Sequence, residues 1–214
     1  MDKFTDWLTE KQIIPFLFKE SVHHELIRRS GALLRVLAEN KKMSEADLVS
    51  LWDSSIAGDK HEDVVRATLD VMQELAEDLP LEVLEGLIKR VKSIPDGKVD
   101  EKFLNFMKGF TQNLMKNIKM RNRRGGAIYR SSSKDVLGEI LKYCDLERFW
   151  NLSLDSTKVD VKLKEESIKC LIEILDDPEI QDERYTYIQR AITNLKGVSV
   201  QLAHLLERER PPQH

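Results

Sequence analysis

Apolar residues recur every three or four positions along most of the chain, which is the spacing of one face of an α-helix. Strand-type alternation is hard to find, and Gly and Pro are scarce at 9 and 6 residues. The pattern therefore predicts an all-α chain. The clearest stripe covers five turns and comprises Val64, Thr68, Val71, Met72, Leu75, Ala76 and Leu79.

Polar residues in front of these stripes predict where the helices begin. Thr9 and Ser44 each stand three positions before another polar residue, in the form of a capping box that satisfies the first backbone N–H groups of a helix. Asp59 is expected to open the helix of the clearest stripe in the same way. Gly197 is expected to end a helix, because glycine is common just after a helix C-terminus.

Two pairs of predicted helices resemble each other. Residues 23–28 align with 61–66 at an offset of 38, and the shorter helix that follows each aligns at an offset of 36. A long helix, a short connection and a shorter helix at this period are typical of stacked helical repeats. We therefore predict one armadillo/HEAT-like domain over residues 1–214, a right-handed superhelix of nine or ten helices. A compact helical bundle is the alternative.

Composition supports a folded chain without a membrane segment. Hydrophobic residues make up 41% and charged residues 33%, and a net charge of −3 gives no general attraction to nucleic acid or anionic membranes. No signal peptide or spanning helix is recognisable. Two cysteines suit a reducing compartment, so a cytoplasmic location is expected. The end at Arg210–His214 resembles a cut or a linker, so the chain is expected to belong to a longer one.

One segment departs from the acidic average. No Asp or Glu occurs from Lys102 to Lys134, a stretch with nine Lys and Arg residues. Residues 119–134 are interpreted as a flexible loop, because they combine charge with two adjacent glycines and three serines. The alternatives are contact with an acidic partner and, least favoured, nucleic-acid binding, since Tyr129 is the loop's one aromatic residue. The candidate partner-binding residues are Lys119, Arg121, Arg123, Arg124 and Arg130.

Candidate catalytic and metal-binding residues do not form a recognisable motif. His24 and His61 each precede a Glu, but neither completes a His-Glu-x-x-His motif, and both are expected near helix starts. Cys144 and Cys170 lie inside helical patterns, as small residues near a core do. We therefore expect no catalytic residue, no metal and no cofactor. A small cysteine hydrolase is the least favoured hypothesis.

The three tryptophans are expected to pack in the core. Trp7, Trp52 and Trp150 each fall on or near an apolar helix face. An exposed tryptophan in a groove would instead serve as an anchor for a partner.

Two series of residues stand in a recognisable order. The first series is Leu51-Trp52, Lys60-His61-Glu62, Val64-Val65, Asp70, Leu75-Ala76 and Asp78-Leu79. The second is Phe149-Trp150-Asn151-Leu152, Asp155, the helix of 168–175, Gln181-Asp182, Tyr187-Ile188 and Asn194-Leu195-Lys196. Over residues 45–90 and 145–200, this order resembles the armadillo-like helical region that precedes the protease domain in very large ubiquitin-specific proteases.

The resemblance implies a non-catalytic role. The parent chain would be a deubiquitinase whose catalytic Cys and His lie elsewhere, and the segment itself would recognise substrates or adaptor proteins. It implies protein partners, no membrane, and leaves the oligomeric state open. The alternative is a free-standing armadillo/HEAT adaptor that is unrelated to ubiquitin.

Overall fold

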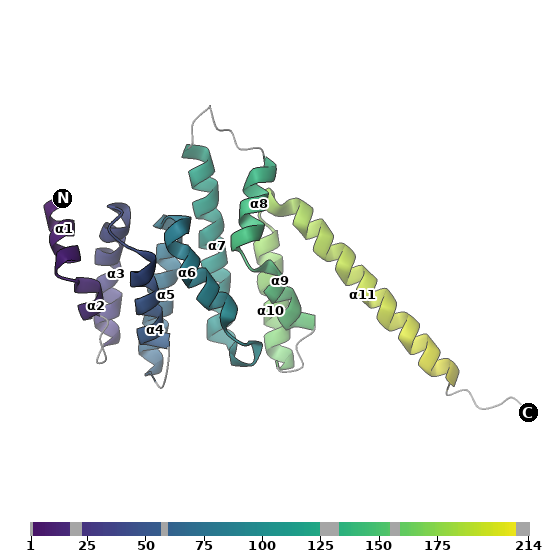
Figure 1. The fold of residues 1–214 in the computed structure, drawn as a ribbon. Helices are drawn as coiled ribbons and strands as arrows, with labels where there is room; N and C mark the ends of the chain where they lie inside the picture. The colour runs from purple at the N-terminus through teal and green to yellow at the C-terminus, as the bar shows by residue number, and fades with distance from the viewer. Residues whose placement is uncertain (1, 18–22, 57–59, 125–132, 155–158, 209–214) are drawn as a thin grey trace, which may run out of the picture. The chain divides into compact units, whose positions relative to one another are not determined.

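The computed structural model describes residues 2–17, 23–56, 60–124, 133–154 and 159–208 (Figure 1). Within them the chain forms eleven α-helices, two short 3-10 helices and no strand. The prediction of an all-α helical-repeat fold is therefore confirmed. The helix count exceeds nine or ten because the first residues form an additional helix, α1 (Asp2–Glu10), before α2 (Ile13–Leu17).

Contacts divide the chain into two compact units, residues 1–174 and 175–214. The first unit contains α1 to α10, and the second contains the 3-10 helix η2 (Pro178–Ile180) and α11 (Gln181–Arg208). The expectation of a single domain over 1–214 stays a prediction. None of the described helices combines the length and the apolar character that crossing a membrane requires.

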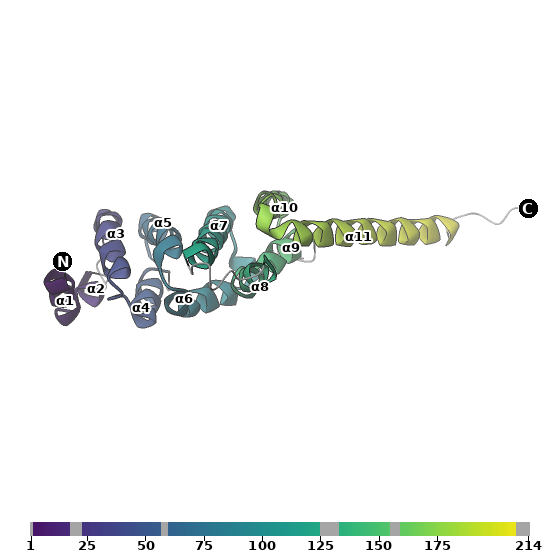
Figure 2. The ribbon, with the colours of Figure 1, turned by 90° about the horizontal axis from the view of Figure 1, so that it is seen from above.

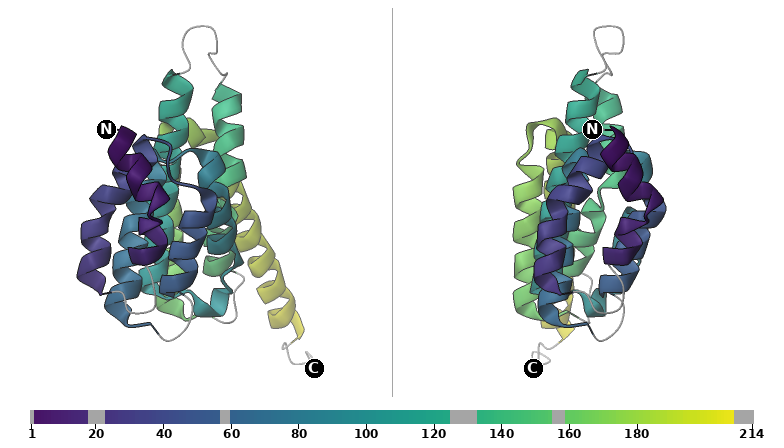
Figure 3. Two further views of the ribbon diagram at one scale, coloured as in Figure 1. Left: turned by 60° about the vertical axis from the view of Figure 1, so that its left-hand side comes forward. Right: turned by 90° about the vertical axis from the view of Figure 1, so that its left-hand side faces the viewer.

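The helices of the first unit lie in two rows (Figure 2). One row holds α3 (His24–Glu39), α5 (Glu62–Asp78), α7 (Glu101–Arg124) and α10 (Val161–Leu175). The other holds α4 (Glu45–Ile56), α6 (Leu81–Ser93), α8 (Ser133–Tyr143) and α9 (Leu146–Leu154). A 3-10 turn, η1 (Asp96–Lys98), joins α6 to α7. Figure 3 shows the same two rows of this unit from its N-terminal side.

The apolar stripes face the space between the rows. In α5, Thr68, Val71, Met72, Leu75 and Ala76 are buried, as the sequence predicts. Each fully buried Leu or Met side chain stabilises the fold by about 1.5–3 kcal/mol relative to an exposed one. The stripe of α3 is buried in the same way, so both members of the aligned repeat use corresponding faces.

Helix starts in the α3 row carry a side-chain acceptor. The Nδ1 atoms of His23 and His61 accept from backbone N–H groups two residues on, at 3.3 Å, at the start of α3 and α5. Histidines near helix starts are thus confirmed. Asp59 lies outside the described residues, and His61 is the N-cap in its place. Asp100 and Asp160 accept from N–H groups at the start of α7 and α10, at 2.7 and 2.8 Å.

Of two other predicted helix boundaries, one is confirmed and the other is wrong. Ser44 and Asp47 form the predicted reciprocal cap, since each backbone N–H donates to the other side chain, at 2.9 and 3.2 Å. Thr9 instead lies in the last turn of α1, where its hydroxyl donates to the Thr5 carbonyl at 3.0 Å. The helix ends there because Gln12 adopts a left-handed φ of 49°.

The predicted loop and the predicted glycine stop also need correction. Helix α7 continues to Arg124 and α8 begins at Ser133, so residues 119–124 are helical and not part of a loop. The rest of that loop, residues 125–132, lies outside the described residues. Helix α11 runs through Gly197 to Arg208, because one glycine costs a helix only about 1 kcal/mol.

Candidate functional site

The basic segment forms most of α7, and acidic side chains of neighbouring helices neutralise much of it. α7 carries seven basic side chains and one acidic, whereas the adjacent α5 carries six acidic and one basic. Opposite charges on neighbouring helices explain why an acidic chain contains so basic a segment. The ion pairs of α7 are Lys102–Glu62, Lys108–Glu173 at 2.9 Å, Lys116–Glu77 at 3.5 Å and Arg121–Glu82 at 3.3 Å.

The five candidate partner-binding residues fall at the end of α7 and beyond it. Lys119 is half-buried, Arg121 pairs with an acid of α6, and Arg123 is exposed. Arg124 is the last residue of the helix, and its side chain lies outside the described residues, as does all of Arg130. A binding role for these residues stays a prediction.

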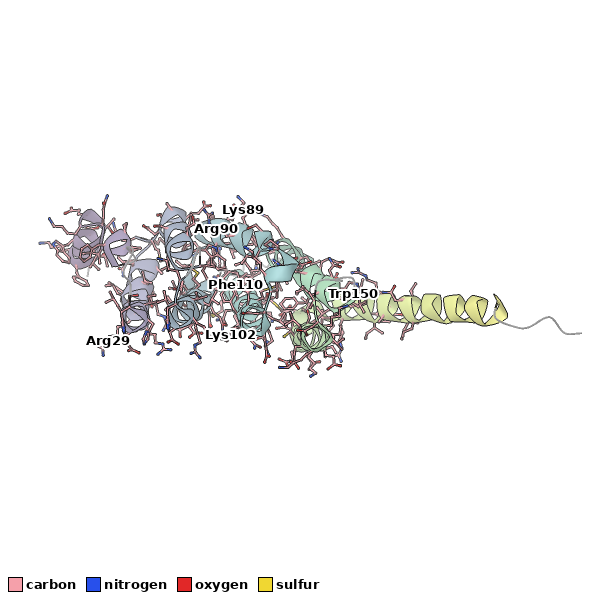
Figure 4. The ribbon with its side chains drawn as sticks, turned by 90° about the horizontal axis from the view of Figure 1, so that it is seen from below. Arg29, Lys89, Arg90, Lys102, Phe110 and Trp150 are labelled. Carbon is pink, nitrogen blue, oxygen red and sulfur yellow. The ribbon has the colours of Figure 1, made fainter. Side chains whose placement is uncertain are left out.

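A groove of about 1040 Å³ lies between the first halves of α5 and α7, beside the last turns of α4 and α6. Residues 62–73 and 102–112 form its two long walls, and residues 93–100 close one end. Figure 4 shows Arg90 on the α6 row, Lys102 on the α7 row and Phe110 between the two rows. The groove is the best candidate for a binding site among the described residues.

The floor of the groove is aromatic. The ring centroid of Trp52 in α4 lies 6.4 Å from that of Phe103 and 6.1 Å from that of Phe106 in α7. These three side chains are buried, so the floor is rigid and apolar. Behind the floor, Phe106 continues the cluster to Phe110, with centroids 5.4 Å apart. The core position predicted for Trp52 is confirmed, as is that of Trp150.

The rim of the groove is polar, and its charges are largely paired. Arg90 donates from Nε and Nη2 to the two carboxylate oxygens of Asp53, both at 2.9 Å. This hydrogen-bonded pair lowers the pKa of Asp53 and raises the pKa of Arg90. Lys98 is exposed and has no ion pair within the described residues. The neutral amides of the rim belong to Gln73, Asn105 and Gln112.

Gly109 allows one of these amides to reach across the groove wall. A Cβ atom at Gly109 would overlap the side-chain amide of Gln73, which lies directly over the glycine. Gly86 plays the same part between α6 and α4, where a Cβ would come within 2.9 Å of Val49 Cγ2. Both glycines stand within helices because another side chain occupies the space that their own would fill.

Two asparagines of α7 fix the walls of the groove against each other. The buried Asn117 side chain donates from Nδ2 to the carbonyls of Ala76 and Leu79, at 2.8 and 2.6 Å. Asn113 donates to the carbonyl of Gln73 at 2.7 Å. The bonds from Asn117 satisfy carbonyl groups at the end of α5 that would otherwise lack helical partners, and Asn113 adds a second bond to a carbonyl within that helix. We call this set of contacts, with Gly109 and Gln73, the α5–α7 seam.

A buried arginine fixes the closed end of the groove. The guanidinium of Arg148 in α9 donates to the carbonyls of Val91 and Lys92, at 2.8 and 3.3 Å, and to the carbonyl of Ile94. It also lies 3.4 Å from the carboxylate of Asp96. A cation at the C-terminus of α6 is favourable because the helix dipole is negative there. Sequence reasoning missed this residue, since a buried arginine has no apolar signal.

The cysteines are not poised for nucleophilic chemistry. Burial raises the pKa of the Cys144 thiol to about 12, and burial also raises the pKa of Cys170. The thiolate is the reactive form, so both side chains stay protonated near neutral pH. Among the described residues, His, Cys, Asp and Glu do not gather into a group of three or more that could bind a metal.

The prediction that Trp7 packs in the core is wrong. Its side chain is 48% exposed, and the neighbouring Phe4 and Phe16 are 53% and 69% exposed. Every other described Phe and Trp side chain is buried. Within the described residues, α1 and α2 lie at one end of the first unit. Thr5 and Leu8 are buried there, and Trp7 stays exposed on another flank of α1.

Comparison with known proteins agrees with this architecture. Residues 1–207 match the family described as the UBP24/USP9X/USP9Y ARM repeat. A 53-residue stretch is 32% identical to the ubiquitin carboxyl-terminal hydrolase puf of Drosophila melanogaster, covering 25% of this chain and 1% of that protein. No solved structure matches the chain. The family match covers nearly the whole sequence and confirms the resemblance, so the chain belongs to the UBP24/USP9X/USP9Y ARM-repeat family.

Proposed function

We propose that this chain is a non-catalytic scaffold that binds proteins, as the substrate- or partner-recognition segment of a larger ubiquitin-specific protease. Membership of an ARM-repeat family supports the scaffold role, because stacked repeats form extended surfaces for partners. The relative from Drosophila is named a ubiquitin carboxyl-terminal hydrolase, and only 1% of its length aligns here. That coverage supports a segment that works beside a separate catalytic domain.

The groove is the single observation that carries the proposal. It combines an aromatic floor of Trp52, Phe103 and Phe106 with a rim of paired charges and neutral amides. Protein interfaces have this composition, with an apolar centre inside a polar border. A partner would place an apolar side chain over the floor and bond its backbone to Gln73 and Asn105.

The state of the two cysteines supports the non-catalytic part of the proposal. Cys144 and Cys170 are free and buried, and burial keeps both thiols protonated. Free cysteines suit a reducing compartment, so we propose a cytoplasmic location. A ubiquitin-based probe that traps catalytic cysteines should form no adduct with this chain, and an adduct at either cysteine would overturn the non-catalytic role.

Site-specific photo-crosslinking in cells tests the groove directly. A benzophenone amino acid at Asn105, on the rim, should yield discrete protein adducts. The same group at Lys89, an exposed residue of α6 that does not line the groove, serves as the matched control. Adducts from position 105 alone support the proposal. No adducts, or equal labelling from both positions, would contradict it.

A further inference from the structure

Two charged side chains of the groove rim have no partner within the described part of the chain. Lys98 lies in the 3-10 turn that closes one end of the groove, and Asp70 lies in the α5 wall. Both side chains are exposed, and neither makes an ion pair or a hydrogen bond with another described residue. The two charges are of opposite sign, so a ligand that satisfies both must itself carry both signs.

The other charges of the rim are occupied by neighbours in the chain. Asp100 accepts from the Phe103 backbone N–H at 2.7 Å, as the cap of α7. The ion pairs are Lys102–Glu62, Arg66–Asp63 at 3.0 Å, Arg90–Asp53 at 2.9 Å and Lys108–Glu173 at 2.9 Å. Within the described residues, Lys98 and Asp70 are therefore the two rim charges that a ligand can contact without breaking an internal pair.

These two charges are separated along the groove. Glu62 pairs with Lys102, next to the turn that closes the end. Asp70 follows Glu62 by two helical turns, so it lies about 12 Å farther along the α5 wall. An extended peptide advances about 3.3 Å per residue, so about four residues cover that distance. The two charges can therefore contact different residues of one peptide.

Three neutral amides along the groove suit the backbone of such a peptide. They belong to Gln73, Asn105 and Gln112, and none of these side chains makes a hydrogen bond within the described residues. Each carboxamide can donate and accept, as can each peptide unit of an extended segment. The buried rings of the floor offer an apolar surface between the two charges.

We propose that the groove binds one extended peptide segment of a partner protein, with an acidic side chain at Lys98, an apolar side chain on the aromatic floor and a basic side chain at Asp70. This inference rests on the proposed scaffold function and adds the chemistry of the partner. Rim charges without partners favour a ligand of complementary sign and disfavour one of like sign. The positions of acid, apolar residue and base therefore decide which segments bind.

Selection from a phage-displayed library of random short peptides on the immobilised whole chain tests the proposal. Enriched peptides should carry one acidic and one basic residue about four positions apart, with a large apolar residue between them. Lys98→Glu should replace the selected acid by Lys or Arg, and Asp70→Lys should replace the selected base by Asp or Glu. The double variant K98E/D70K should select peptides with the two charges exchanged.

Titration of a fluorescently labelled peptide, selected on the wild-type chain, measures the size of the effect. Either single reversal should weaken binding about five- to tenfold, because an attractive contact becomes a repulsive one, and added salt should reduce the difference. Lys89→Glu is the matched control, since it reverses an exposed charge of α6 that does not line the groove. It should change neither the selection nor the affinity. Circular dichroism should show every variant folded.

The outcomes that contradict the inference differ from those that contradict the scaffold role. Selected peptides whose charges ignore both reversals would overturn the acid and base positions. A library from which no peptide is enriched would overturn an extended peptide as the occupant. If photo-crosslinks form at Asn105 in either case, the scaffold role stands and only the peptide chemistry fails. Absent crosslinks would contradict the scaffold role itself.

Discussion

The α5–α7 seam and the α1–α2 layer differ in how completely their side chains are covered by neighbouring helices. In the seam, Asn117 donates hydrogen bonds to two backbone carbonyls, and Gly109 leaves space for a neighbouring side chain. In the α1–α2 layer, Phe4, Trp7 and Phe16 remain exposed. The contacts of the seam are made within the chain, whereas three aromatic side chains of the α1–α2 layer stay exposed.

The difference shows which helices contribute most to the stability of such a stack. A helix with a neighbour on each side, such as α5, buries its stripe and neutralises its charges, so it contributes to stability. Helix α1, with a neighbour on one side within the described residues, leaves Phe4 and Trp7 about half exposed and contributes less. Substitutions in the two regions should therefore change stability by different amounts.

The largest expected effect lies in the seam. Asn117→Ala leaves the carbonyls of Ala76 and Leu79 buried without donors, which should lower the free energy of unfolding by about 2–3 kcal/mol. Urea denaturation followed by circular dichroism measures it. Asn105→Ala is the matched control, because that side chain is exposed on the same helix, and it should change stability by less than about 0.5 kcal/mol. Equal effects would show that Asn117 does not hold α5.

A pair of glycine substitutions separates crowding from helix propensity. Gly138→Ala in α8 meets nothing within 4 Å and should stabilise the chain by about 0.5–1 kcal/mol, through higher helix propensity. Gly109→Ala should change stability by less than about 0.5 kcal/mol, because displacing the flexible Gln73 amide offsets the same gain in propensity. Thermal melts of both variants give the comparison. Equal stabilisation at positions 109 and 138 would contradict the close approach.

A substitution in the end layer should cost less stability. Trp7→Ser removes a side chain that is half exposed, so the monomer should lose under about 1 kcal/mol. Urea denaturation followed by circular dichroism measures the change. A loss as large as that of Asn117→Ala would place Trp7 in the core after all.

The smallest expected effect concerns the groove rim and pH. The hydrogen bond from Arg90 lowers the pKa of Asp53 below its ordinary value of 3.8, so the unfolded chain binds the proton more readily. The resulting stability is present above pH 4 and is lost as the pH falls through the lowered pKa. Because the pair is exposed, the loss should stay under about 1 kcal/mol. Asp53→Asn should remove this part of the acid dependence, and an unchanged pH profile would exclude the pair as its source.

The sequence predicted the elements that depend on local periodicity. The buried faces of α3 and α5 follow the apolar stripes, and Ser44 caps α4, because these features need only residues a few positions apart. Thr9 was wrongly predicted as a helix start, because α1 already begins at Asp2 and the chain turns after it at Gln12, whose φ is left-handed. Gly197 failed because a single glycine does not overcome a long helical pattern.

The groove was harder to predict because it forms between helices far apart in sequence. One signal was present: the stripe of Phe106 and Phe110 continues in register to Asn113 and Asn117, which placed two amides on a buried face. Arg148 gave no such signal. The basic segment was interpreted as a flexible loop at 119–134, with an acidic partner as an alternative, whereas acids of neighbouring helices pair with much of α7.

Hydrogen–deuterium exchange tests most directly whether the α5–α7 seam is more stable than the α1–α2 layer. The account predicts that backbone amides in the seam, such as those of Leu75 and Leu114, exchange at least about 100-fold more slowly than that of Leu8 in α1. Equal protection of α1 and α5 would contradict it.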